Sequence, residues 1–263
     1  MALKTTGCLL VLIASSPLYG GIPIQVREGR LAVDGVYVNS HGPYRFLIDT
    51  GTNVNLIESR LAKAIGMTAT FQVDLASAAG KVAMPGTDGN GIELGPVKAN
   101  GQKFLFSRLD AIHNLMPDVQ GVLGQWFLSG FDYMLDLRGR RLEFGKQNLS
   151  GRRSPARTLN GRTAVSTSLG DLVLDSGAGR LVLFDIDPDR NGQRSNKGYM
   201  QTVAGSQIAG TAFSSLIIEG RTIWRGDAVV IAGRAQPGVS GLMPLSLFKT
   251  IYVCNSEGYV VFE

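Results

Sequence analysis

The sequence has little cysteine and little histidine. Cys8 and Cys254 are its two cysteines, and Cys8 lies in a segment that we interpret as a targeting signal, so the mature chain is expected to hold one thiol and no internal disulfide. Cys254 ends the apolar run at residues 251–254 and is expected to be a small buried strand residue. The two histidines, His41 and His113, argue against a His-rich metal site, and a single thiol without an obvious partner argues against a Cys–His nucleophile.

Long hydrophobic runs are also absent. Residues 8–14, CLLVLIA, form an apolar run too short to span a bilayer, after a positive start at residues 1–4 and before small residues and a proline. We interpret residues 1–20 as a cleaved signal peptide, which predicts a secreted or periplasmic protein; the alternative is a buried N-terminal strand. No other segment has the length and apolarity of a membrane span, so none is expected in the mature chain.

Charge is sparse, at 18% of residues, and its basic excess is concentrated in one region. Residues 138–162 hold Arg138, Arg140, Arg141, Lys146, Arg152, Arg153, Arg157 and Arg162. A nucleic-acid surface is one interpretation. Only Phe144 interleaves these residues as an aromatic, and no nucleic-acid motif accompanies them, so a solvated linker with flanking turns is favoured and no nucleic-acid partner is expected.

Extended helical periodicity is missing, whereas glycine is abundant, at 34 residues. Together with alternating β-branched and aromatic residues at 31–38, this predicts a mostly β chain of short strands. One helix is expected after residue 56, where Ile57, Leu61, Ala64 and Ile65 recur at helical spacing and Gly66 is a plausible end.

The chain repeats its pattern once. Residues 121–131, GVLGQWFLSGF, align with residues 238–248, GVSGLMPLSLF, and each segment leads into a strand, a polar turn and a second strand. Upstream of them stand two similar motifs, IDTGT at residues 48–52 and LDSGA at residues 174–178, followed by small-residue turns at residues 76–80 and 203–206. We therefore expect two homologous β lobes, residues 21–145 and 164–263, joined by a basic linker at residues 146–163.

Each motif places a carboxylate at the end of an apolar strand, where a lone charge is costly to bury. Two such groups, Asp49 and Asp175, could meet between the lobes and share one proton, because two adjacent carboxylates cannot both ionise. One would act as general base on a water while the other polarises a carbonyl. Gly51 and Gly177 would permit the close approach, and Thr50 and Ser176 would lock the geometry by bonds to the opposite backbone.

The two motifs resemble the active-site motifs of the aspartic peptidases, and Val122-Leu-Gly124 resembles the hydrophobic segment that crosses behind their active loop. The match in both halves is similar to the bilobal, pepsin-like arrangement, and the helix after the first motif is similar to bacterial retropepsin-like proteins. The resemblance implies two β lobes of the acid-protease type, related by a pseudo-twofold axis with a cleft between them. It also implies an aspartic endopeptidase with catalytic Asp49 and Asp175, an extended peptide or protein substrate, a single-chain monomer, and no cofactor or metal. Thr52 resembles the residue whose hydroxyl bonds an outer carboxylate oxygen. Cover of the substrate would come from Ala78, Ala79, Gly80, Lys81, Ala204 and Gly205.

Three departures from this family pattern weaken the second half and the cover. Ser240 stands where the alignment expects an apolar residue, which predicts weaker packing behind Asp175. Ala178 replaces a hydroxyl residue, which predicts one hydrogen bond fewer to Asp175 and a higher pH optimum than in the most acid-acting relatives. The turn at residues 76–80 has no Tyr or Trp, which predicts weaker cover of the substrate.

Three other interpretations stay open at this point. Actin-like and sugar-kinase-type proteins also carry two Asp-x-Gly loops that bind phosphates, but they require two α/β lobes with long helices. A protease fold that binds peptides without turnover would be a binding module. Helix N-caps or turns explain one Asp motif well, but they do not explain the same motif twice in the same relative place.

Overall fold

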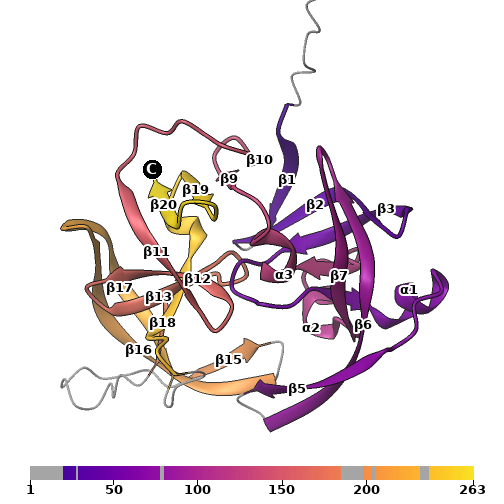
Figure 1. Cartoon of the computed structure of the whole chain (residues 1–263). Coiled ribbons are helices and arrows are strands. Elements are labelled where there is room, and N and C mark those ends of the chain that lie inside the picture. The colour runs from indigo at the N-terminus through magenta and orange to yellow at the C-terminus, as the bar shows by residue number, and fades with distance from the viewer. Residues whose placement is uncertain (1–19, 28, 78–79, 185–197, 203–204, 232–236) are drawn as a thin grey trace, which may run out of the picture.

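A computed structural model of the chain describes residues 20–27, 29–77, 80–184, 198–202, 205–231 and 237–263. The fold is mostly β, with 58% strand and 8% helix. This confirms the predicted fold class and disagrees with the long-helix α/β lobes that a phosphate-loop protein would need. Figure 1 shows the earlier residues on one side of the molecule and the later ones on the other.

In the first half, strands of 3 to 15 residues follow one another in chain order. They are β1 (Ile22–Arg27), β2 (Arg30–Val38), β3 (His41–Ile48), β4 (Leu56–Glu58), β5 (Phe71–Ser77), β6 (Gly80–Leu94), β7 (Val97–Ser107), β8 (Gly121–Leu123), β9 (Tyr133–Asp136) and β10 (Arg141–Phe144). The helices among them are α1 (Ser59–Ala64), α2 (Asp110–His113) and α3 (Gln125–Leu128). Helix α1 confirms that a helix follows the first Asp motif, and Gly66, at φ +75°, follows its end. The expected start was wrong, because Ile57 lies on β4 and the helix begins at Ser59.

The second half runs through β11 (Arg153–Leu159), β12 (Arg162–Thr167), β13 (Gly170–Asp175), β14 (Val182–Phe184), β15 (Gly198–Thr202), β16 (Gly205–Ile218), β17 (Arg221–Ile231), β18 (Gly241–Pro244), β19 (Thr250–Cys254) and β20 (Tyr259–Phe262). A short 3₁₀ helix, η1 (Leu245–Leu247), follows β18. Cys254 is buried in β19, as expected.

Strand pairings recur in the two halves. β3 pairs in parallel with β8, and β13 pairs in parallel with β18. β4 lies between β7 and β8, and β14 lies between β17 and β18, with the same mixture of parallel and antiparallel pairing. This correspondence supports the proposed repeat of two lobes; the pseudo-twofold axis itself remains a prediction.

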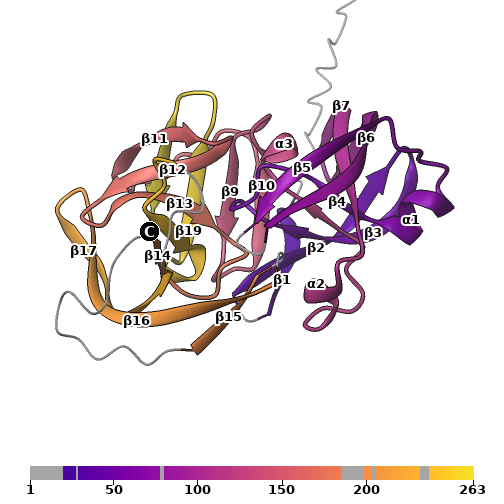
Figure 2. The same ribbon diagram turned by 90° about the horizontal axis from the view of Figure 1, so that it is seen from below.

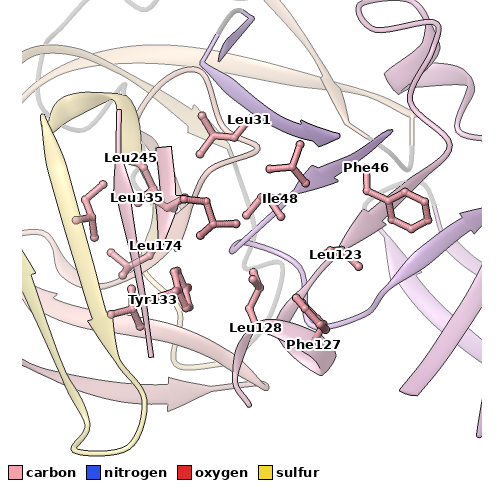
Figure 3. Close-up of a cluster of buried hydrophobic side chains, with 14 of the residues drawn as sticks. Leu31, Phe46, Ile48, Leu123, Phe127, Leu128, Tyr133, Leu135, Leu174 and Leu245 are labelled. Carbon is pink, nitrogen blue, oxygen red and sulfur yellow. The ribbon is translucent and has the colours of Figure 1, made fainter. Parts of the chain in front are cut away.

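One sheet joins the halves, in the order β1, β10, β9, β19, β20, β11. Its central pair is antiparallel, with Met134 opposite Tyr252 and Leu135 opposite Ile251. Buried side chains from both halves pack above it, among them Ile48 and Leu174 (Figure 3). Each half contributes strands to this sheet and side chains to the same buried cluster. The strands that end in the two Asp motifs therefore pack on one common core.

The expected linker at residues 146–163 is wrong for most of its length. β11 occupies Arg153–Leu159 and pairs with both β12 and β20, and β12 begins at Arg162. The basic residues had suggested solvation, but an arginine on a strand can keep its charged end in water while its backbone pairs. Arg153 illustrates this, since its guanidinium lies 4.3 Å from the ring centroid of Tyr259 on the neighbouring strand.

Two hairpins extend from opposite halves of the molecule (Figures 1 and 2). β5 pairs with β6 up to Ser77 opposite Gly80, and β15 pairs with β16 up to Thr202 opposite Gly205. In the described part of the chain, no helix is long and apolar enough to cross a membrane.

Candidate active site

Each of the two predicted carboxylates stands at the end of a buried strand. The β3 strand runs beside β8, and its continuation is fixed by a hydrogen bond from the Asp49 backbone N–H to Leu123 O at 3.0 Å. Asp175 ends β13, where it pairs with Pro244 of β18. Asp49 and Asp175 therefore occupy equivalent positions, each at the end of a strand inside its own half.

The hydroxyl residues after the two acids bond across the halves. Thr50 Oγ1 donates to Leu174 O at 2.8 Å, and Ser176 Oγ donates to Ile48 O at 2.6 Å. Each hydroxyl also accepts the other residue's backbone N–H, both at 3.0 Å. Thr50 and Ser176 are buried, so these four bonds satisfy backbone groups that water does not reach.

Glycine is required where the loops meet. A Cβ added to Gly51 would lie 2.2 Å from Asp175 Cγ, and one added to Gly177 would lie 3.0 Å from Asp49 Oδ2 and 3.1 Å from Asp175 Oδ1. Any larger residue at position 51 would displace the Asp175 carboxylate. The structure thus brings Asp49 and Asp175 together around the two glycines that the motifs contain.

The two carboxyl groups differ in their environments. Asp49 Oδ1 accepts the Gly51 N–H at 2.9 Å, and burial, followed by the charge of Asp175, raises the pKa of Asp49 to about 7. Burial also raises the pKa of Asp175, but the backbone N–H groups of Gly177 and Ala178 oppose this effect by donating to its Oδ1 at 2.7 and 3.0 Å. A pair with raised pKa values that titrates as a unit can hold a proton in weakly acidic solution.

The hydroxyl pattern differs from that expected at residues 52 and 178. Among the described residues, the Thr52 side chain has no hydrogen bond to Asp49; its Oγ1 accepts the Val54 N–H at 3.5 Å. At the matching place Ala178 has no hydroxyl, yet its backbone N–H bonds Asp175 directly. At position 178, Asp175 therefore receives a main-chain hydrogen bond and no hydroxyl bond.

The register predicted for the second half is wrong by three residues. Phe46 pairs with Gly121 and Leu172 pairs with Gly241, so Gly121 corresponds to Gly241 rather than to Gly238. Both glycines make the same close approach: an added Cβ would lie 2.7 Å from Leu56 O at Gly121 and 2.1 Å from Val182 O at Gly241.

This shift overturns the prediction of weak packing at Ser240. Leu242 and Met243 stand beside β13, and Met243 is fully buried. Ser240 precedes the strand and takes part in backbone bonds with Asp171 and Phe184. Gly238 and Gly241 lie three residues apart, so Gly121 could be aligned with either of them. The apolar pair that follows Gly241, Leu242 and Met243, was the signal that favoured Gly241.

The residues predicted to cover the substrate lie at the ends of the two hairpins. Gly80 and Lys81 begin β6, and Gly205 begins β16. Ala78, Ala79 and Ala204 lie outside the described residues, as do residues 1–19 of the predicted signal peptide.

Three supporting residues were not identified from the sequence. Gln125 Nε2 donates to Thr50 O at 3.0 Å, and Asn55 Oδ1 accepts the Gly124 N–H at 3.0 Å, so both hold the first loop. Arg162 Nη1 donates to Gly51 O at 3.3 Å. Gln125 follows the VLG segment directly, which was a usable signal, whereas Arg162 was grouped with a basic stretch interpreted as solvated.

Within the part of the chain that the structure describes, no group of three or more His, Cys, Asp or Glu side chains could hold a metal ion.

Residues 35–127 match a family model described as an aspartyl protease. This stretch runs from Gly35 in β2 to Phe127 in α3 and contains Asp49 but not Asp175. The match shows that this stretch is similar to aspartyl proteases and confirms the resemblance indicated by the first motif. No curated protein matches the chain.

Proposed function

From the aspartyl protease match over residues 35–127, we propose that the chain is an aspartic endopeptidase with Asp49 and Asp175 as its catalytic pair. The observation that carries the proposal is the contact of the two acids around Gly51 and Gly177, at buried strand ends. Burial and mutual charge raise the pKa of Asp49 to about 7, so the pair keeps one proton under conditions in which an exposed Asp has none.

The proposed reaction is the addition of water to a peptide carbonyl. The ionised carboxylate takes a proton from water, whose oxygen bonds to the carbonyl carbon. The protonated carboxyl gives its proton to the carbonyl oxygen as the C=O π bond breaks. When the tetrahedral intermediate collapses, the carboxyl that took the water proton gives it to the amide nitrogen and the C–N bond breaks. One hydroxyl of the intermediate loses its proton to the other carboxylate as the C=O bond forms again.

Rigid loops make this arrangement effective, because reacting groups must be held in place before the reaction. Thr50 and Ser176 would supply this rigidity through their bonds across the halves, with Gln125 holding the Thr50 carbonyl. Gly51 and Gly177 permit the contact of the acids. Thr52 would support the first loop through its bond with Val54 rather than by touching Asp49.

The substrate would be an extended peptide that pairs with strand backbone, as sheet edges do with added strands. We propose that the β5–β6 and β15–β16 hairpins cover it, with Gly80, Lys81 and Gly205 near their ends. Because one chain carries both acids, a monomer would suffice. The signal-like residues 1–20 favour action in a secreted or periplasmic setting.

The test is cleavage of a mixed peptide library by the mature chain between about pH 3 and 7, a range that spans the ordinary Asp pKa and that of Asp49. Internal cleavage that persists in EDTA and is blocked by a statine-type inhibitor, whose hydroxyl resembles the tetrahedral intermediate, is the expected result. Saturable peptide binding without cleavage would instead indicate a protease-fold binding module. Turnover of ATP would support the phosphate-loop alternative.

A further inference from the structure

Arg162 reaches the first Asp loop from the second half. It begins β12 directly after Gly161, which has φ +74° and whose added Cβ would lie 3.3 Å from Asn53 Cβ. The turn between β11 and β12 is therefore packed on the loop that follows Asp49. From there the half-buried Arg162 side chain donates from Nη1 to Gly51 O at 3.3 Å.

The peptide that Arg162 holds is the one that lines Asp175. An added Cβ on Gly51 would lie 2.5 and 2.6 Å from the two carboxylate oxygens of Asp175. A guanidinium bonded to Gly51 thus stands beside the catalytic pair in a largely desolvated place, where a charge acts more strongly than it does at the surface. Arginine suits this position because it stays ionised when partly buried.

The charge of Arg162 lowers the pKa of Asp175, and a side-chain hydrogen bond with Asp49 lowers it as well. Burial lowers the pKa of Arg162, whereas the charges of Asp175 and, to a smaller extent, Asp49 in turn raise it. The neighbouring elements α3 and η1 present Gln125 and Leu245–Leu247, which carry no charge. Two further cations lie on adjoining segments: Arg30 follows Gly29, whose turn packs on Gly179, and Arg180 donates to Asp227 O.

Backbone N–H groups support both acids. Asp175 Oδ1 accepts those of Gly177 and Ala178 at 2.7 and 3.0 Å. Asp49 Oδ1 accepts that of Gly51 at 2.9 Å, and the Thr52 backbone also lowers the pKa of Asp49, so the difference between the acids comes from Arg162. Donors and a cation both favour the ionised form of Asp175. Arg162 lowers the pKa of Asp175 against the effect of burial, while the charge of Asp175 adds to burial in raising the pKa of Asp49.

We propose that Arg162 is a positioning residue that assigns the roles of the pair: it keeps Asp175 ionised as the general base and leaves the shared proton on Asp49 as the general acid. This inference rests on the proposed peptidase function. The two Asp motifs are similar in sequence, so they do not by themselves determine which acid is ionised; the position of Arg162 does. In the first step, the water proton goes to Asp175 and the Asp49 proton goes to the carbonyl oxygen.

The kinetic test compares Arg162→Gln with Arg162→Lys and with Arg157→Gln, which removes an exposed arginine on the preceding strand. In Arg162→Gln, the acidic limb of the pH profile of kcat/KM is expected to move up by about 1 unit, as for loss of a nearby opposite charge. Arg162→Lys should restore most of that shift, and Arg157→Gln should leave the limb in place. An unmoved limb in Arg162→Gln, or an equal shift in Arg157→Gln, would overturn the proposal.

A second measurement does not depend on turnover. Carbon-13 NMR of aspartate carboxyl groups, with the Asp175 signal assigned from Asp175→Asn, gives the titration of Asp175 directly. Its midpoint should rise in Arg162→Gln and stay near the wild-type value in Arg162→Lys; an unchanged midpoint in Arg162→Gln refutes the role. If Arg162→Gln does not fold, Arg162→Met provides the neutral side chain. Failure of the wild type to cleave peptides would refute the peptidase function while these titrations still decide the effect of Arg162.

Discussion

Thr50 and Ser176 exchange backbone and side-chain hydrogen bonds across the two halves of the chain. The Thr50 N–H donates to Ser176 Oγ and the Ser176 N–H donates to Thr50 Oγ1, each at 3.0 Å, while both hydroxyls donate onward to carbonyls of the opposite strand. This reciprocal arrangement ties the two Asp loops to each other. It explains how two carboxylates can be held together although their charges repel.

Substitution of Thr50 by Val should weaken the protein while keeping the side-chain shape. The change leaves the Ser176 N–H and Leu174 O without their partner in a buried place, which costs about 1–3 kcal/mol. Denaturant unfolding would measure the free energy, with Thr50→Ser as the control that retains the hydroxyl. Equal stability of Thr50→Val and the wild type would show that these bonds do not hold the loops.

The register of β18 predicts opposite outcomes at two neighbouring positions. Met243 is fully buried beside β13, so Met243→Ala should lower the free energy of unfolding by about 2–5 kcal/mol. Ser240 lies before the strand and is half-buried, so Ser240→Ala should change it by about 0.5 kcal/mol or less. If Ser240→Ala were the more damaging change, the register that pairs Leu172 with Gly241 would be wrong.

Stability should depend on pH through Asp49. Its folded-state pKa, about 7, lies above the ordinary Asp value, so the folded state binds a proton more tightly than the unfolded chain. This contribution is complete below about pH 4 and is lost as the pH rises toward 7. Denaturant unfolding across this window should show a steeper loss of stability in the wild type than in Asp49→Asn; parallel curves would contradict the raised pKa.

Catalytic activity should fall as the shared proton is lost. Because burial and Asp175 raise the pKa of Asp49 to about 7, kcat/KM should decline above about pH 7 and should be highest in weakly acidic solution. A pH–rate profile of peptide cleavage checks this. A maximum below about pH 3, well under the ordinary Asp pKa, would contradict it.

Sequence patterns predicted the β class, because short stretches of β-branched and apolar residues stand between glycine-containing segments. They did not predict strands as long as β6, with 15 residues, and β16, with 14. The first Asp motif and the VLG segment at residues 122–124 could be recognised as parts of one site. The spacing of Asp49, Gly121 and Gly124 left only one way to align them with the family pattern. The second half was harder, because Pro244 stands where Gly124 stands in the first and a Gly-x-x-Gly pair at Gly238 offers a false match. Register there was decided by packing between β13, β14 and β18, which a linear pattern does not contain.

Charge patterns misled in one region for a physical reason. Arginine on an edge or hairpin strand looks the same in sequence as arginine in a linker, so β11 was predicted as a linker and Arg162 was treated as solvated. Its approach to Gly51 depends on how the β11–β12 turn packs against Asn53, a contact between residues far apart in the chain. Contacts of this kind follow from the tertiary fold rather than from local propensity.

The most direct measurement of the central claim is kcat/KM for a cleaved peptide in the wild type, Asp49→Asn and Asp175→Asn. Asp110→Asn, which alters an exposed carboxylate, is the matched control. Each substitution in the pair should lower kcat/KM by about 10²–10⁴-fold, because it removes a positioned acid or base, while the control keeps wild-type activity. Activity in either Asp49→Asn or Asp175→Asn equal to that of the control would contradict the shared-proton pair.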